Sequence, residues 1–345
     1  MATLQTLDFS KYLHGSDAER NQLCYDLVAS FKQHGFAKLI NHGIPDEQVK
    51  ELFDWSAKMF KLPLKDKLAM ANVPNDAPQR GWSRQGAETT AYLRQKVSAN
   101  EKLSDEKEHW DCSSADDTEF PNQWPSDSAL PGFRPFVEKA FGDLQQASLQ
   151  IMAAMEIGLD LPRGTFVDKC RVTASELRLN HYPEVSLAKL REGKTKRGWP
   201  HADFGLITFV FQDGVGGLEM EDRSAPGTFV PVPPGAPGGK TELAINISET
   251  FQRWTNDAIP AGIHQVAPPA EMLEMEDGIV PERYSNIFFF KASKDAIASP
   301  LPEFVTEENP ARYKPTTALQ FQKARTLYLH SLHRAANQVT QTARA

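Results

Sequence analysis

Short apolar runs separated by glycine and proline fill the chain after residue 170, and this pattern constrains the fold most strongly. Six or seven of these runs have the length of single β-strands; they cover residues 177–182, 206–211, 218–220, 229–232, 243–247, 263–266 and 283–290. Many short strands at such spacing are typical of a sandwich or a barrel. The sequence therefore predicts a β core of the jelly-roll kind over residues 171–300.

Helical periodicity dominates the rest of the chain. Apolar residues recur every three or four positions in four segments, residues 17–34, 46–60, 133–159 and 317–338. Gly35 is predicted to end the first of these helices and Asp46 to cap the second, with a short strand at 36–40 between them. The predicted fold class is therefore mainly β with α (α+β), in which N-terminal and C-terminal helices flank the jelly-roll core.

Four segments follow from these patterns, and we expect them to form one compact structural unit. Residues 1–130 are an N-terminal region of helices and a strand, 131–170 a scaffold helix, 171–300 the jelly roll, and 301–345 a C-terminal segment with a helix. Residues 71–131 are polar and rich in asparagine, serine, aspartate and proline. Long stretches of this kind inside a compact domain are either disordered or a functional lid or wall, and the interleaved Trp82, Tyr92, Trp110 and Trp124 favour ordered loops.

The overall composition excludes several classes of partner. The 345 residues carry a net charge of −7, which offers no basic surface to nucleic acid or to an anionic membrane. No run of about 18 apolar residues predicts a membrane span. Three scattered cysteines, Cys24, Cys112 and Cys170, predict neither a disulfide framework nor a structural zinc site. We expect a cytoplasmic protein without a signal peptide, a monomer or a weak homo-oligomer, that binds a small-molecule substrate.

One polar motif precedes the apolar run at residues 206–211. His201 and Asp203 stand two residues apart, and the alternation of side chains along a strand would place both on one face. An imidazole and a carboxylate are two of the three ligands of the 2-His-1-carboxylate site, which binds non-haem Fe(II). A surface polar pair at a strand end is the alternative, because His-X-Asp is common by chance.

Two later β runs supply a candidate for the third metal ligand and a candidate site for a carboxylate. His264 follows Asp203 at a distance that allows two hairpins to bring the chain back beside the first strand. Arg283 and Ser285 are again two residues apart, and a guanidinium with a neighbouring hydroxyl matches a carboxylate. A carboxylate anchored near an open metal site is what a 2-oxoglutarate co-substrate requires. Taken alone, a histidine on an apolar strand is more often a core or surface residue than a ligand, and an arginine such as Arg283 is also explained by a local ion pair; the ordered combination is much more specific.

With these motifs the chain resembles the Fe(II)/2-oxoglutarate-dependent dioxygenases of the isopenicillin N synthase-like superfamily, in particular its microbial and fungal secondary-metabolism members. The resemblance covers residues 6–335. In the N-terminal part it rests on Gly-Phe at 35–36, Asn-His-Gly-Ile-Pro at 41–45, Phe-Lys-Leu-Pro at 60–63, Arg-Gly-Trp at 80–82 and Asn-Gln-Trp-Pro at 122–125. In the catalytic part it rests on Asn-His-Tyr-Pro at 180–183, His-Ala-Asp-Phe-Gly at 201–205, Gln-Asp at 212–213, Gly-Gly-Leu at 216–218, Arg-Trp-Thr-Asn at 253–256 and Arg-Tyr-Ser at 283–285.

The resemblance implies a distorted double-stranded β-helix, the jelly roll, that carries Fe(II). By motif position, His201, Asp203 and His264 would be the iron ligands and the catalytic centre. The implied enzyme is an oxidoreductase that acts on paired donors with O₂. It would couple the decarboxylation of 2-oxoglutarate to succinate and CO₂ with the oxidation of a small organic substrate.

The same resemblance implies a site for the co-substrate. Arg283 and Ser285 would hold the distal carboxylate of 2-oxoglutarate, and Tyr182 and Asn180 would also reach this molecule. Two alternatives remain: a same-fold Fe(II) oxidase that does not use 2-oxoglutarate, like isopenicillin N synthase, and a non-catalytic jelly-roll binding protein.

The substrate is the least constrained part of the prediction, because the motifs are shared by enzymes that hydroxylate, desaturate or rearrange rings. A natural-product intermediate is the leading hypothesis, and pyrimidine oxidation is the alternative. The position of Trp82, Arg84, Phe211 and the 84–112 region in the sequence makes them candidates for the substrate wall.

Overall fold

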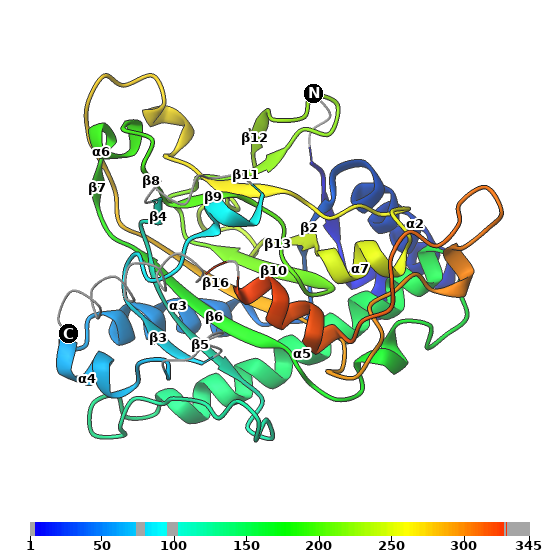
Figure 1. Ribbon diagram of the computed structural model, residues 1–345, viewed down its shortest axis with the longest axis horizontal. Coiled ribbons are helices and arrows are strands. Elements are labelled where there is room, and N and C mark those ends of the chain that lie inside the picture. The colour runs from blue at the N-terminus through cyan, green and yellow to red at the C-terminus, as the bar shows by residue number, and fades with distance from the viewer. Residues whose placement is uncertain (1–3, 74–79, 95–102, 328, 330–345) are drawn as a thin grey trace, which may run out of the picture.

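The computed structural model describes residues 4–73, 80–94, 103–327 and 329, and two sheets form its centre (Figure 1). The larger sheet contains, in order across it, β1 (Thr6–Asp8), β2 (Phe36–Ile40), β13 (Leu243–Ile247), β10 (Ile207–Gln212), β16 (Arg283–Phe290), β6 (Glu176–Tyr182), β5 (Glu108–Ser113) and β3 (Gly81–Ser83). The smaller sheet contains β12 (Phe229–Pro231), β11 (Leu218–Glu221), β14 (His264–Val266) and β9 (Gly198–His201). This architecture confirms the predicted α+β class with a jelly-roll core.

β16, the central strand of the larger sheet, lies between the main hydrophobic core on one face and a cavity on the other. It is antiparallel to β10 on one side and to β6 on the other. Successive side chains of a strand face opposite sides of the sheet. On β16, Phe288 and Phe290 therefore face the main hydrophobic core, whereas Arg283, Ser285 and Ile287 line a cavity between the two sheets.

Three long helices cover the outer face of the larger sheet. They are α2 (Asp17–His34), α3 (Asp46–Phe60) and α5 (Phe133–Gly158). α3 contacts β6 and β16, and α5 contacts α2 and β16; Figure 1 shows α5 running along the sheet. The apolar faces of these helices and the outward side chains of the sheet form one continuous core. Burial of this core holds the larger sheet in place behind the cavity.

Short elements complete the described chain. The helical ones are α1 (Ser10–His14), α4 (Leu64–Ala69), α6 (Leu187–Arg191), α7 (Glu249–Trp254), η1 (Thr90–Leu93), η2 (Val167–Cys170), η3 (Ala270–Met272) and η4 (Pro302–Phe304). Two small sheets pair β7 (Val185–Ser186) with β15 (Ile279–Val280), and β4 (Ser104–Asp105) with β8 (Thr195–Lys196). Among the described residues, no helix combines the length and the apolar character needed to cross a membrane.

The predicted helix ends are confirmed in part. Gly35 ends α2 with a positive φ of 73°, and its N–H donates to the carbonyl of Phe31, as predicted. The prediction that Asp46 caps α3 is wrong by one residue, because extended Pro45 is the N-cap. The Asp46 carboxylate instead accepts a hydrogen bond from the backbone N–H of Thr241. The C-terminal helix is present over residues 318–327, and the rest of its predicted span lies outside the described residues, except for Leu329.

Two other predictions are corrected. His201 and Asp203 do not share a strand: His201 is the last residue of β9, and Asp203 lies in the connection to β10. The polar stretch at residues 71–131 is not all loop, because β3 and β5 extend the larger sheet. The sequence of β5 is mostly polar, yet every one of its residues is buried, so no alternation of apolar and polar residues marked it as a strand.

A close approach of two glycines positions β14. A Cβ atom at Gly262 would lie 2.5 Å from the Gly35 carbonyl oxygen and 2.7 Å from the ring of Phe36. We expect Gly262→Ala to lower the free energy of unfolding by about 2 kcal/mol, because the backbone cannot give way at this contact. Urea denaturation measures this change.

The matched control is Gly142→Ala in α5, where a Cβ would meet no atom within 4 Å. This substitution is expected to raise the free energy of unfolding by about 0.5–1 kcal/mol through helix propensity. Equal effects of the two substitutions would contradict the role of the Gly35–Gly262 contact.

Candidate active site

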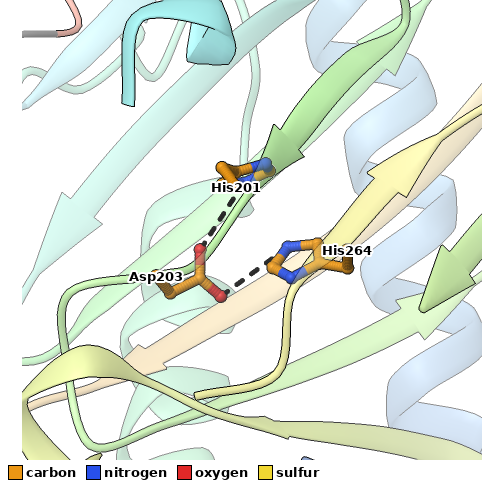
Figure 2. Close-up of side chains that lie close together, drawn as sticks. All are labelled: His201, Asp203 and His264. Carbon is orange, nitrogen blue, oxygen red and sulfur yellow. Dashed lines mark ion pairs between the residues drawn. The ribbon is translucent and has the colours of Figure 1, made fainter. Parts of the chain in front are cut away.

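His201, Asp203 and His264 converge at the wall of the cavity between the two sheets (Figure 2). β9 pairs with β14 so that His201 lies opposite His264, and their ring centroids are 4.3 Å apart. Nε2 of His201 lies 3.7 Å from one oxygen of Asp203, and Nε2 of His264 lies 3.9 Å from the other. One ligand atom from each residue lies within 4.8 Å of the other two.

Backbone carbonyls fix the orientation of both imidazoles. Nδ1 of His201 lies 2.7 Å from the carbonyl oxygen of Trp199, and Nδ1 of His264 lies 3.0 Å from that of Gly262. A carbonyl only accepts, so each Nδ1 carries the proton and donates it, which leaves the Nε2 lone pairs directed at Asp203. Burial and the adjacent His264 ring lower the pKa of His201 to about 3. Its imidazole is therefore neutral, as a metal ligand requires.

The Asp203 carboxylate is held by neighbours from β13. The side-chain amide of Asn246 donates to Oδ2 of Asp203 at 2.8 Å, and Asn246 is fully buried. Burial alone would raise the pKa of Asp203, but the two histidines and the hydrogen bond from Asn246 outweigh it and lower the pKa. The residue is therefore a carboxylate. Two imidazoles and one oriented carboxylate are the donor set that suits non-haem Fe(II).

A buried guanidinium stands at the other end of the same cavity wall. Nε of Arg283 donates to the Gly216 carbonyl at 2.8 Å, and one Nη to Oε1 of Gln212 at 3.2 Å. Its other terminal nitrogen, Nη1, has no hydrogen-bond partner within the described chain, although the residue is only 1% exposed. A buried charged donor without a partner is costly, so this nitrogen fits an anionic ligand.

The residues around Arg283 include the other three that were predicted to reach the co-substrate. In the register of β16 with β6, Arg283 lies opposite Tyr182, and Ser285 lies opposite Asn180. The guanidinium lies over the Tyr182 ring at 4.9 Å, and the Asn180 amide donates to the Ser285 hydroxyl at 3.3 Å. The structure thus brings together all four residues predicted for the co-substrate, on the inner face of two paired strands.

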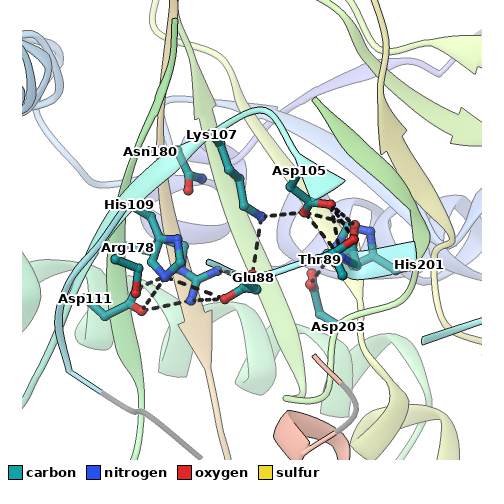
Figure 3. A network of polar contacts seen from close by, with 12 residues as sticks. Glu88, Thr89, Asp105, Lys107, His109, Asp111, Arg178, Asn180, His201 and Asp203 are labelled. Carbon is teal, nitrogen blue, oxygen red and sulfur yellow. Dashed lines mark hydrogen bonds and ion pairs between the residues drawn. The ribbon is translucent and has the colours of Figure 1, made fainter. Parts of the chain in front are cut away.

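Sequence reasoning missed a group of buried charges on the cavity wall, which we call the Arg178 cluster (Figure 3). Its members are Glu88, Asp105, Lys107, Asp111 and Arg178. Arg178 donates to both oxygens of Glu88 and to both oxygens of Asp111, at 2.7–3.2 Å. Lys107 lies 3.3 Å from Glu88 and 3.2 Å from Asp105. The available signal was the position of Arg178, two residues before Asn180 on the same strand.

The predicted substrate wall is only partly correct. The 84–112 region does contribute lining residues to the cavity, among them Glu88, Lys107 and Asp111. Trp82 and Phe211 instead pack in the main core, and Arg84 is exposed and does not line the cavity.

Comparison with known proteins agrees with this geometry. Residues 4–127 match the family described as non-haem dioxygenase in morphine synthesis N-terminal, and residues 174–292 match the 2OG-Fe(II) oxygenase superfamily. The chain is 46% identical to the 2-oxoglutarate-dependent dioxygenase phqC of Penicillium fellutanum, over 92% of this chain and 93% of that protein. This chain belongs to the 2OG-Fe(II) oxygenase superfamily.

Other members of the superfamily share the whole fold. The 2-oxoglutarate-dependent dioxygenase imqE of Aspergillus flavus is 44% identical over 94% of this chain and 93% of its own. A full-length Neurospora crassa protein, solved in complex with alpha-KG, superposes with a TM-score of 0.81 and 27% identity, covering 94% of this chain and 95% of that one. A Caulobacter crescentus family protein superposes with a TM-score of 0.75 and 28% identity, covering 94% and 98%.

Membership of this superfamily settles the class of reaction. The protein is an Fe(II)- and 2-oxoglutarate-dependent dioxygenase that uses O₂ and acts on a small-molecule substrate. The relatives named as 2-oxoglutarate-dependent enzymes do not favour the two alternatives, an oxidase independent of 2-oxoglutarate and a non-catalytic binding protein.

A second group of cavity charges makes the stability of the protein depend on pH. Glu176 forms ion pairs with Arg80 and Lys291. Burial would raise its pKa, but these two cations outweigh burial and lower the pKa to about 2. Because the folded-state pKa lies below the unfolded value, the pairing stabilises the fold above about pH 4.5, and this contribution is lost as the pH falls toward 2.

We therefore expect Glu176→Gln to flatten the loss of stability on acidification, removing about 3 kcal/mol of the change between pH 5 and pH 2. Urea denaturation over this pH range measures the slope for the variant and for the unmodified protein. The control is Glu271→Gln at an exposed residue of η3, which is expected to keep the original slope. An unchanged slope in Glu176→Gln would contradict the assignment.

Proposed function

We propose that His201, Asp203 and His264 bind the Fe(II) of this dioxygenase through two imidazole Nε2 atoms and one carboxylate oxygen. The observation that carries the proposal is the convergence of these three atoms within 4.8 Å, with each Nδ1 already engaged by a backbone carbonyl. A triad of this kind leaves coordination positions open for a co-substrate and for O₂.

We also propose that the distal carboxylate of 2-oxoglutarate binds to Arg283. Nη1 of this residue is the buried donor without a partner, and the Ser285 hydroxyl lies two residues further along the same face of β16. Tyr182 and Asn180, on the paired strand, complete the wall around this carboxylate. The four side chains and the metal triad line one cavity, so one molecule can reach both.

The chain contributes position and environment to the reaction. O₂ is the oxidant: Fe(II) held by the triad would activate it, 2-oxoglutarate would supply two of its four electrons on conversion to succinate and CO₂, and the substrate would supply the other two. Arg283 orients the co-substrate from a buried position where its attraction to a carboxylate is weakly screened. Apolar residues that line the same cavity, including Val210, Leu218 and Ile287, exclude water from the site.

The substrate is proposed to be a small natural-product intermediate or its precursor. Supporting this, a relative of 37% identity, buaE of Petromyces alliaceus, is named a proline hydroxylase, over 94% of this chain and 98% of its own. The pyrimidine alternative has the weaker support of the Neurospora crassa protein at 27% identity, which was also solved with thymine.

The cellular location, oligomeric state and partners of the enzyme are proposed from its net charge and its cysteines. We propose that it acts in the cytoplasm as a monomer or weak homo-oligomer, without nucleic-acid or membrane partners. The net charge of −7 and the three buried free cysteines support this setting. We further propose that the segments 1–130, 131–170, 171–300 and 301–345 act as one structural unit.

Anaerobic addition of 2-oxoglutarate to the Fe(II)-loaded protein is expected to produce a weak visible charge-transfer band. Arg283→Gln is expected to raise the 2-oxoglutarate concentration at half-maximal band intensity by about 100-fold, because two charge-assisted hydrogen bonds are lost. The control is Arg312→Gln, which changes an exposed arginine later in the chain. This variant is expected to reach half-maximal band intensity at the same 2-oxoglutarate concentration as the unmodified protein. Absence of the band in folded, iron-loaded protein, or of succinate release on exposure to O₂, would refute the proposed function.

Asn246→Ala is expected to weaken Fe(II) binding by about 10–100-fold, because the hydrogen bond that orients Asp203 is lost. The matched control is Asn286→Ala, which removes an equally buried asparagine whose side chain bonds Ser56 on the opposite face of the sheet. Anaerobic Fe(II) titration, with thermal melting to compare the fold, distinguishes the two variants. Equal loss of iron affinity in both would show that the effect is one of stability.

A further inference from the structure

A second cavity, which we call the α6 pocket, adjoins the active-site cavity at β14. Its walls come from α6, from β8 and the residue after it, and from the chain between Gln265 and Leu273. α6 contacts β7 and β8, and Figure 1 shows this helix beside both strands. The pocket contains about 590 Å³ of space, part of it open to solvent. Val266 lines both cavities, so a ligand in the α6 pocket lies close to the active site without entering it.

The lining of the α6 pocket combines cations with apolar side chains. Arg191, Lys196 and Arg197 are cations, and none of the described residues that line the pocket is an aspartate or a glutamate. The apolar surface comes mainly from leucines of α6 and of the segment after η3, which are Leu187, Leu190 and Leu273. Such walls match a ligand that has a carboxylate at one end and a short hydrocarbon chain at the other.

Arg197 carries donors that the protein leaves without partners. The residue is only 1% exposed, and two of its nitrogens, Nε and Nη1, have no hydrogen-bond partner within the described chain. The third nitrogen, Nη2, donates to the backbone carbonyls of Pro183, at 3.2 Å, and of Pro281. Carbonyl groups offset a buried positive charge only in part, so the two remaining nitrogens fit an anionic ligand.

The carboxylates that attract Arg197 are held by other groups. Asp213 accepts hydrogen bonds from two backbone N–H groups, and Glu106 forms an ion pair with Lys189 at 2.8 Å. Burial and the neighbouring Arg283 outweigh the attraction of these two carboxylates and lower the pKa of Arg197 to about 10. The positive charge of this buried guanidinium is therefore poorly compensated by the protein itself.

The other two cations of the pocket are hydrogen-bonded to neutral groups. Arg191 donates to backbone carbonyls within residues 273–276 and so joins α6 to the segment after η3. Nζ of Lys196 lies 3.4 Å from Oε1 of Gln265 and 5.1 Å from the centre of the Trp199 ring. Both positive charges therefore add to that of Arg197 in attracting an anion.

The α6 pocket is electrostatically linked to the proposed co-substrate anchor. The Arg197 guanidinium lies 6.0 Å from the Tyr182 ring, and the Arg283 guanidinium lies 4.9 Å from the same ring. Both arginines are buried, so solvent screens the space between them only weakly. An anion beside Arg197 offsets part of the positive potential that attracts the distal carboxylate of 2-oxoglutarate.

We propose that the α6 pocket binds a small aliphatic carboxylate against Arg197, and that this ligand weakens the binding of 2-oxoglutarate at Arg283. Arg197 lines the α6 pocket and not the active-site cavity, so the ligand acts as an effector and not as a substrate. By linkage, 2-oxoglutarate weakens the binding of the effector by the same factor. The effect on 2-oxoglutarate rests on the proposed function, since it takes Arg283 as the anchor.

Hexanoate is the probe, and hexan-1-ol and acetate control for its charge and its chain. Each compound is titrated by calorimetry into the full chain, which is loaded with Fe(II) and saturated with 2-oxoglutarate under anaerobic conditions so that the anchor is occupied. Hexanoate is expected to bind about 30-fold more tightly than either control, because hexan-1-ol lacks the charge-assisted hydrogen bonds and acetate lacks the chain.

Two variants test the location of the site. Arg197→Gln removes the charge and is expected to weaken hexanoate binding about 30-fold. Leu190→Trp narrows the pocket, leaves Arg197 in place and is expected to weaken hexanoate binding about 10-fold through steric conflict, so it decides the matter even if Arg197→Gln does not fold. The control is Leu64→Trp at an exposed residue of α4 that lines neither cavity, and it is expected to bind hexanoate like the unmodified protein. Thermal melting compares the stability of the variants.

The visible band measures the effect on the co-substrate. Saturating hexanoate is expected to raise the 2-oxoglutarate concentration at half-maximal band intensity about 3-fold and then no further, because the two anions repel each other from separate sites. A competitor inside the active-site cavity raises that concentration without limit. The 3-fold effect is expected to be absent in Leu190→Trp at the same hexanoate concentration.

The outcomes separate this inference from the proposed function. Absence of hexanoate binding, equal binding of hexan-1-ol, or undiminished binding in Leu190→Trp overturns the site. Binding in the pocket with an unchanged 2-oxoglutarate titration overturns the effect on the co-substrate. If no visible band forms in folded protein, the proposed function fails, whereas calorimetry without 2-oxoglutarate still decides whether the α6 pocket binds hexanoate.

Discussion

The antiparallel pairing of β6 with β16 is the constraint on which the rest of the structure depends. It sets Arg283 opposite Tyr182 and Ser285 opposite Asn180 on the cavity side. On the other side it places Phe288 in the core beneath the helices. A shift of one residue would turn the arginine into the apolar core and the phenylalanine into the cavity. The stability of the fold and the position of the proposed co-substrate anchor therefore depend on one register.

Structural features that appear as a short repeat of residue types along the chain could be predicted from the sequence. The jelly-roll class followed from short apolar runs, and the pair Arg283 and Ser285 followed from the two-residue repeat of a strand. The same reasoning grouped His201 with Asp203 correctly but for the wrong reason, since only His201 belongs to a strand. Their approach is produced by the pairing of β9 with β14 and by the bend of the chain before β10.

Contacts between distant segments with polar sequences could not be predicted in this way. Arg178 meets Glu88 and Asp111 across 90 and 67 residues of chain, and no local pattern relates these positions. β5 was missed because its carboxylates are buried by ion pairs with other segments, Glu108 with Lys67 and Asp111 with Arg178, rather than by apolar packing. The motif of His201, Asp203 and His264 is thus visible in the sequence, whereas the charged part of the cavity wall emerges only when the chain is folded.

The segment that contains η1 and β5 has a further consequence. It contributes Glu88, Lys107 and Asp111 to the cavity, whereas the metal triad lies on or beside strands of the smaller sheet. The strands that carry the proposed metal ligands and the segment that carries the charges of the opposite wall are therefore largely separate. If the triad holds the metal as proposed, substitutions or insertions in this segment would change the cavity without disturbing the strands that hold it. In evolutionary terms, such an architecture would let the range of substrates diversify while the oxidative chemistry stays constant.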